Sequence, residues 1–234
     1  MRALISRLSL KIAFSRIVFV ASITLIFLGS HPVHAQNSAK DLRIAANDNR
    51  APAGSLQDRS LNIELEARQG EWFPESENGS SMKVMVFAEA GKQPQMPGPL
   101  IRIPEGTTIH ARVRNLLVVP IIVHGLHERP GKMEDTLPIA PGETGEATFQ
   151  AGKPGTYYYW ASAGGDTWNG RPYKDDSLMN GAFIVDPIGA TVNDRVFVIG
   201  VWRDKQRPDE SLDVPVINGK SWPPRYRGKA YRGS

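Results

Sequence analysis

The chain has 234 residues, of which 41% are hydrophobic and 22% are charged, proportions that are typical of a globular domain. It contains no cysteine, which excludes disulfides, zinc–thiolate sites and a blue copper centre with its thiolate ligand. Four basic residues in 1–35 and four in 224–234 account for more than the formal net charge of +4, which leaves residues 36–223 at −4. Nucleic acid is therefore not an expected partner.

Residues 1–35 have the pattern of a secretory signal peptide. A basic start precedes an apolar stretch of 13 residues (17–29), which is too short to span a hydrocarbon core of about 30 Å. Small residues at Val33 and Ala35 form a cleavage site, with Gln36 as the new N-terminus. We therefore expect a periplasmic or secreted protein with no stable membrane span after cleavage; an uncleaved anchor is the alternative.

The chain from residue 36 onward predicts a disordered lead-in followed by short strands. Residues 36–58 are polar and without periodicity, which is typical of disorder. Apolar and polar residues then alternate with a period of two, and residues 118–126 are a nearly continuous apolar run that predicts a strand buried on both sides. Turn residues separate these strands at regular spacing, which favours an all-β sandwich or barrel. The other predicted strands cover 61–73, 82–91, 100–117 (two strands around a Pro-Glu-Gly turn), 139–150, 155–162 and 179–187.

Four motifs carry a resemblance to a known family. GPLIRIPEGTTIHARVRNLL (98–117), IIVHGLH (121–127), the stretch 141–162 that ends in GTYYYWAS, and GAFIVDP (181–187) occur in the order and spacing of one domain. The chain thus resembles the N-terminal cupredoxin (plastocyanin-like) domain of laccase-like multicopper oxidases. The resemblance implies a cupredoxin-like Greek-key β-sandwich over residues 59–188, copper as the cofactor, and an oxidoreductase that couples oxidation of a substrate to reduction of dioxygen.

Residues 189–223 resemble the opening of the family's second cupredoxin domain, and residues 224–234 form a basic tail without a pattern. We expect that second domain to be incomplete because of a truncated reading frame, with a natural single-domain product as the alternative. Two partners follow from this expectation. One is a C-terminal cupredoxin domain that is missing from the chain. The other is a second copy, because the apolar stretch 196–202 then forms an unprotected strand edge.

The resemblance also implies four copper ligands in this domain, two in each histidine motif. Ile122 and His124 stand at the first pair of positions, and Trp160 and Ser162 stand at the second pair. One position of four is therefore a histidine. We expect the indole of Trp160 to fill the vacated copper space with apolar surface.

His127 is a second candidate ligand beside His124. Residues three apart on a regular strand point to opposite faces, so the two imidazoles converge only if the strand breaks at Gly125, where glycine permits unusual backbone angles. The metal-site hypothesis is His124 with His127 and no catalytic residue. In the alternative, His124 packs in a strand end and His127 caps a loop beside Glu128 and Arg129.

Three functions remain open. The first is a multicopper-oxidase-type domain of an exported oxidoreductase, inactive as an isolated chain because no cysteine site admits electrons. The second is a non-enzymatic periplasmic copper-binding protein that uses His124 and His127. The third is a metal-free cupredoxin-like interaction module.

Overall fold

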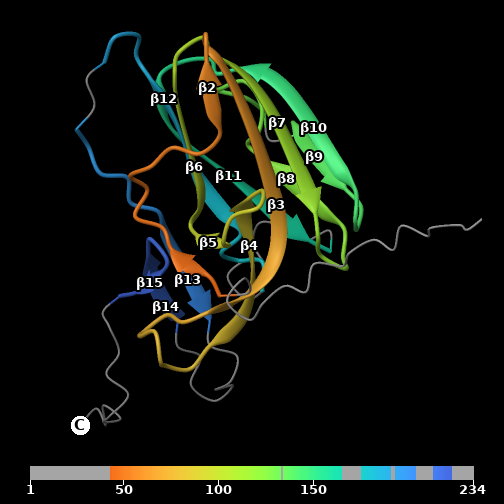
Figure 1. Cartoon of the computed structure of the whole chain (residues 1–234), viewed down its shortest axis with the longest axis vertical. Helices are drawn as coiled ribbons and strands as arrows, with labels where there is room; N and C mark the ends of the chain where they lie inside the picture. Colours follow the sequence, from red (N-terminus) through yellow and green to blue (C-terminus); the bar gives the residue numbers. More distant parts are fainter. Residues whose placement is uncertain (1–42, 133, 165–174, 191–192, 204–212, 223–234) are drawn as a thin grey trace, which may run out of the picture. The chain divides into compact units, whose positions relative to one another are not determined.

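The computed structural model describes residues 43–132, 134–164, 175–190, 193–203 and 213–222. The chain divides into two compact units, 1–36 and 37–234, and every described residue belongs to the second unit. The described residues form strands and turns and contain no helix (Figure 1), which confirms the all-β prediction. It follows that none of their elements is an apolar helix able to cross a membrane. The predicted signal peptide and basic tail lie outside the described ranges.

Two five-stranded sheets make up most of the fold. In the first, the order is β10-β7-β3-β2, and β4 also pairs with β3; in the second, the order is β6-β12-β11-β8-β9. The pairs β3–β7 and β6–β12 are parallel, and the other pairs within these two sheets are antiparallel. The strands of the first sheet are β2 Ser55–Gln57, β3 Ser60–Trp72, β4 Met82–Glu89, β7 Thr108–Asn115 and β10 Thr144–Gln150. Those of the second are β6 Gly98–Pro104, β8 Ile121–His124, β9 Thr136–Ile139, β11 Gly155–Ala163 and β12 Asn180–Asp186.

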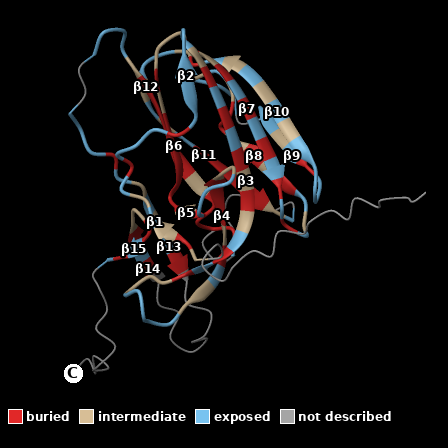
Figure 2. Ribbon diagram, viewed as in Figure 1, coloured by how far each residue is buried: buried red, intermediate tan, exposed pale blue. Residues whose placement is uncertain are grey.

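The core between the two sheets follows from the alternation in the sequence. Leu61, Ile63 and Leu65 of β3 are buried, while the residues between them are exposed, and Figure 2 shows this alternation along the strands. Tyr159 of β11 fills the opposite side of the core, with its ring centre 5.3 Å from that of Phe87. Apolar burial of this kind contributes about 25 cal/mol for each Å² removed from water.

Residues 43–58 are ordered, so the prediction of a disordered lead-in is wrong for this stretch. Strand β1 (Ala45–Ala46) pairs in parallel with β5 (Gln95–Met96), and β2 pairs with the start of β3. Ile44 is 5% exposed and packs in a cluster with Trp72. Backbone hydrogen bonds to neighbouring strands and one apolar anchor order the segment, and neither leaves a periodic pattern in the sequence. Residues 36–42 lie outside the described ranges.

Strand β8 is shorter and less buried than the sequence predicts. It covers only Ile121–His124; Ile121 and Val123 point into the core, whereas Ile122 and His124 are half-buried. Val118, at the start of the apolar run, is 92% exposed in a turn. The prediction of a strand buried on both sides is therefore wrong, because no third layer of the described structure fully covers the outer face of β8.

Residues 199–221 form a three-stranded sheet in the order β13-β14-β15 (Ile199–Arg203, Asp213–Ile217, Lys220–Ser221). This sheet packs on β3 through Trp72, whose ring lies edge-on to Trp202 at 5.8 Å and whose Nε1 donates to the carbonyl of Gly219 at 2.7 Å. Ile199 and Val201 on the other face of β13 are 71% and 41% exposed. A domain boundary between residues 188 and 189 remains a prediction.

Candidate functional site

The four positions implied by the two histidine motifs form one patch on adjacent strands. His124 of β8 is the cross-strand partner of Trp160 on β11, and Ile122 is the partner of Ser162. Directly opposed residues on antiparallel strands point to the same face, as do residues two apart on one strand. All four side chains therefore share the outer face of the second sheet, away from the core.

Trp160 covers His124. The two rings are stacked, with their centres 3.8 Å apart and their planes 6° from parallel. Trp160 is only 9% exposed, and Ser162 is 1% exposed. The indole thus covers one face of the imidazole with apolar surface, and that it fills a vacated copper space remains a prediction.

The chain breaks at Gly125 and brings His127 back toward His124. Strand β8 ends at His124, and Gly125 has a φ of 84°, in the left-handed region that favours glycine. A Cβ at this position would lie 2.5 Å from the carbonyl oxygen of Tyr158, so glycine is also required by the close approach of β11. Both imidazoles line one cavity of about 420 Å³. The predicted convergence of the two side chains on one cavity is therefore present.

The hydrogen bonds of His127 indicate which of its ring nitrogens carries a proton. Its Nδ1 lies 2.9 Å from the carbonyl oxygen of Glu128, and because a carbonyl can only accept, Nδ1 carries the proton. The unprotonated Nε2 faces Nη1 of Arg129 at 3.5 Å. His127 thus caps the loop beside Glu128 and Arg129, as the alternative hypothesis stated, while its Nε2 keeps a lone pair directed at the neighbouring cation.

Three charged residues of the same loop also line this cavity: Arg129, Lys132 and Asp135. The sequence places Arg129 beside His127 but gives it no role at a site, and it does not indicate Lys132 or Asp135 as site residues. These residues lie outside regular strands, so no periodic pattern identifies them. The available signal was a cluster of two cations and three acids within eight residues after His127.

The described residues do not complete a metal site by themselves. They contain no group of three or more His, Cys, Asp or Glu side chains close enough to hold a metal ion. The carboxylate of Asp135 is 3.9 Å from Nδ1 of His127, the nitrogen that carries the proton. Among the described residues two imidazoles line this cavity, fewer than the three protein ligands typical of a catalytic metal site.

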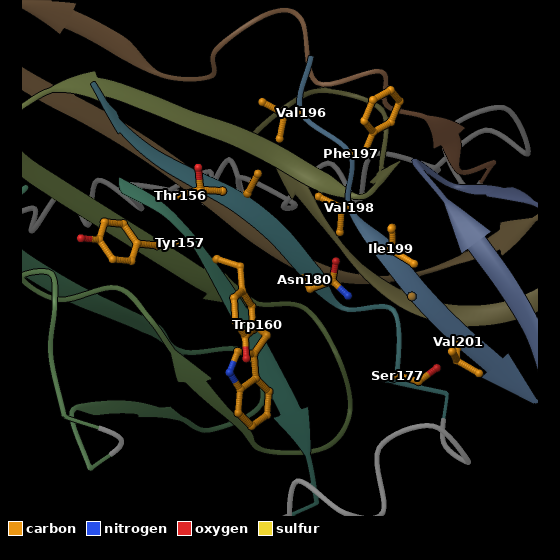
Figure 3. Close-up of a pocket in the computed structure, with 13 residues that line it drawn as sticks. Thr156, Tyr157, Trp160, Ser177, Asn180, Val196, Phe197, Val198, Ile199 and Val201 are labelled. Atoms are coloured by element: carbon orange, nitrogen blue, oxygen red, sulfur yellow. The ribbon is translucent and has the colours of Figure 1, made fainter. Parts of the chain in front are cut away.

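A second cavity of about 480 Å³ lies on the other side of Trp160 and Tyr158, which line both cavities. It is bounded by residues 196–201, and Figure 3 shows this segment beside β12, with Asn180 near Trp160. Phe197 at its edge is 61% exposed. The outer face of β11 thus lines two cavities, one bordered by the charged loop residues after His127 and the other by residues 196–201.

A family model described as multicopper oxidase matches residues 82–189. Among curated proteins, a probable nitrite reductase–hydroxylamine oxidoreductase fusion protein of Kuenenia stuttgartiensis is 28% identical over 157 residues, which cover 61% of this chain and 18% of that protein.

Solved structures show the same fold. A blue copper oxidase from Nitrosomonas europaea is 22% identical with a TM-score of 0.51, covering 70% of this chain and 55% of that one. A laccase from Pediococcus acidilactici is 17% identical with a TM-score of 0.52, covering 76% and 42%. A copper nitrite reductase from Nitrosomonas europaea is 24% identical with a TM-score of 0.50, covering 69% and 57%. The chain spans less than a fifth of the curated relative and about half of these structures.

Proposed function

The chain contains a cupredoxin-like domain of the multicopper oxidase type, and from this premise we propose that it serves an exported oxidoreductase as its N-terminal copper-binding domain. In the intact enzyme, oxidation of a substrate would be coupled to reduction of dioxygen. The observation that carries the proposal is the convergence of His124 and His127 on one cavity at the strand end where the resemblance places a copper ligand.

Copper is the cofactor that the homologues imply, and the two imidazoles fit part of its requirements. Neutral imidazole nitrogen is a preferred ligand of copper, and Nε2 of His127 is unprotonated. The absence of cysteine from the chain leaves no thiolate for a blue copper centre. The remaining ligands would come from outside the described residues, for which a further cupredoxin domain is the proposed source.

The roles of this chain's own residues follow from their contacts. Bound copper would supply the redox chemistry. Gly125 turns the chain so that His127 faces the cavity. The Glu128 carbonyl holds the Nδ1 proton, so Nε2 is the atom that would bind copper, in place of its contact with Nη1 of Arg129. Trp160 excludes water from one face of the His124 ring. We propose that the isolated chain has no oxidase activity, because it holds no cysteine for the site that collects electrons.

Calorimetric titration of the purified, tag-free protein with copper(II) tests the proposal. We expect His124→Ala and His127→Ala each to weaken binding by at least about tenfold, the effect typical of losing a supporting group at a metal site. His110→Ala is the matched control, because His110 is exposed on β7 in the other sheet and bonds only to Thr148. Binding that is unchanged in both site variants would refute the assignment of these ligands.

One observation favours a second function, a metal-free interaction module. The His124 ring is stacked on Trp160, and two more of the four implied ligand positions are Ile122 and Ser162. Under this alternative the patch is packing surface for another protein. Absence of copper from protein purified in copper-supplemented medium would favour it, whereas one bound ion would favour a copper-binding protein.

A further inference from the structure

Arg129 carries a positive charge that no carboxylate of the described residues neutralises. Its guanidinium is half-buried, with its central carbon 4.9 Å from the ring centre of Tyr157, and its Nη2 donates to the carbonyl of Tyr158 at 2.8 Å. Among the described residues Arg129 forms no ion pair, and its Nε is buried without a hydrogen-bond partner. Burial lowers the pKa of Arg129, which reflects the cost of holding an unpaired charge away from water.

Lys132 adds a second cation to the same cavity. It is exposed, and its ammonium forms no ion pair or hydrogen bond with the described side chains; its backbone N–H donates to Asp135. Asp135 is the one acid that lines the cavity, and its carboxylate is already engaged by that N–H at 3.1 Å. Arg129, Lys132 and Asp135 give the charged side chains of the lining a sum of +1, and neither cation has a carboxylate partner among the described residues.

The wall of the cavity is aromatic. Trp160 and Tyr158 line it from β11, and the stacked ring of His124 continues the wall. Tyr158 is 45% exposed, so its ring is accessible to a ligand. A volume of about 420 Å³ lies within the range of small-molecule sites and accommodates one ring with a carboxylate.

We propose that this cavity binds an aromatic carboxylate, with its carboxylate between Arg129 and Lys132 and its ring against Tyr158 and Trp160. The two terminal guanidinium nitrogens keep hydrogens beyond those directed at Tyr158 and His127, and a charge-assisted hydrogen bond from them to a carboxylate is about twice as strong as a neutral one. The ring would gain contact with the aromatic wall. The proposal goes beyond the copper-binding function and does not depend on it, because neither cation is a metal ligand.

Isothermal titration of chelator-treated, copper-free protein with benzoate, benzamide and inorganic phosphate tests the proposal. Benzoate should bind at least about tenfold more tightly than benzamide, because the amide lacks the charge that pairs with Arg129. Benzoate should also bind more tightly than phosphate, because phosphate has no ring to contact the aromatic wall. Equal affinity for benzoate and benzamide, or tighter binding of phosphate, would contradict an aromatic carboxylate site.

Variants that remove a cation and a variant that removes the acid should change benzoate affinity in opposite directions. Lys132→Gln should weaken benzoate binding about threefold, and Asp135→Asn should tighten it about two- to threefold, as for single charges near an exposed site. Arg129→Gln should weaken it at least about tenfold. Arg129 also donates a hydrogen bond to the backbone of Tyr158 on β11. If Arg129→Gln does not fold for this reason, the variants at the exposed residues Lys132 and Asp135 decide the outcome. Lys83→Gln on β4 of the other sheet should change nothing, and identical affinities in all variants would overturn the proposal.

Discussion

Gly125 sets the turn between the two histidines of the candidate site, and its replacement by alanine is the most informative test of that geometry. The residue ends β8 with a φ of 84° and lies between the two histidines. A methyl group there would lie 2.5 Å from the carbonyl oxygen of Tyr158 and 3.0 Å from Cα of Tyr159. Both contacts are to backbone, so no side chain can rotate away, and β8 must move from β11.

Two effects add to the cost. A residue with a Cβ in the left-handed region costs about 1–2 kcal/mol. Overpacking against fixed neighbours costs about 1–3 kcal/mol more. We therefore expect Gly125→Ala to lower the free energy of unfolding by about 2–5 kcal/mol. The displacement of β8 should also weaken copper binding, because it separates His124 from His127.

Gly142→Ala is the matched control for urea unfolding followed by circular dichroism. Gly142 has a φ of 79°, and a Cβ there would meet nothing within 4 Å. It therefore carries the backbone cost of about 1–2 kcal/mol without the clash. If the two variants lose equal stability, the close approach of β11 at Gly125 is not a constraint, and this explanation of the site's geometry fails.

Three further predictions concern Trp160, Trp72 and Tyr159. Trp160→His places an imidazole directly across from His124, where cross-strand Cβ atoms lie about 4.5–5.5 Å apart, so copper(II) affinity measured by calorimetry should rise at least about tenfold. Trp72→Ala removes a fully buried indole and its bond to Gly219, so urea unfolding should show a loss of about 3–5 kcal/mol. Burial raises the pKa of Tyr159, so the folded state favours the neutral phenol; stability should hold below about pH 10 and fall above it. Tyr159→Phe should make that alkaline fall shallower.

Each of these predictions has a contrary result. Unchanged copper affinity in Trp160→His would mean that the two strands do not present their side chains to one ion. A loss below about 1 kcal/mol in Trp72→Ala would mean that the β13–β15 sheet is not anchored on this indole, since buried Trp deletions cost more. An identical alkaline profile in Tyr159→Phe would assign the pH dependence to other groups.

The strands of the sandwich could be predicted because a half-buried strand alternates in sequence. β3, β4, β7 and β11 were expected within a few residues of their observed ends. The ordered residues 43–58 could not be predicted, because their order comes from backbone bonds to β5 and β3 rather than from a repeating apolar face. Burial of β8 was overestimated because an apolar run does not reveal whether a further layer covers its outer face.

The candidate site was partly predictable. The glycine between the two histidines indicated the break after which both imidazoles line one cavity, whereas the stacking of Trp160 on His124 was not foreseen. The unpaired charge of Arg129 could not be foreseen, because it depends on which acids the fold brings near. The sequence shows that Glu128 is adjacent to Arg129, but only the structure shows that no carboxylate in the described part of the chain reaches the guanidinium.

Pulsed EPR of the protein with one equivalent of copper(II) tests the central claim most directly, because nitrogen couplings count the bound imidazoles. The proposed site predicts couplings from two imidazole nitrogens in the wild type and from one in His127→Ala, with His110→Ala unchanged. A wild-type spectrum without imidazole coupling, or one that neither His124→Ala nor His127→Ala alters, would contradict the assignment of copper to this pair.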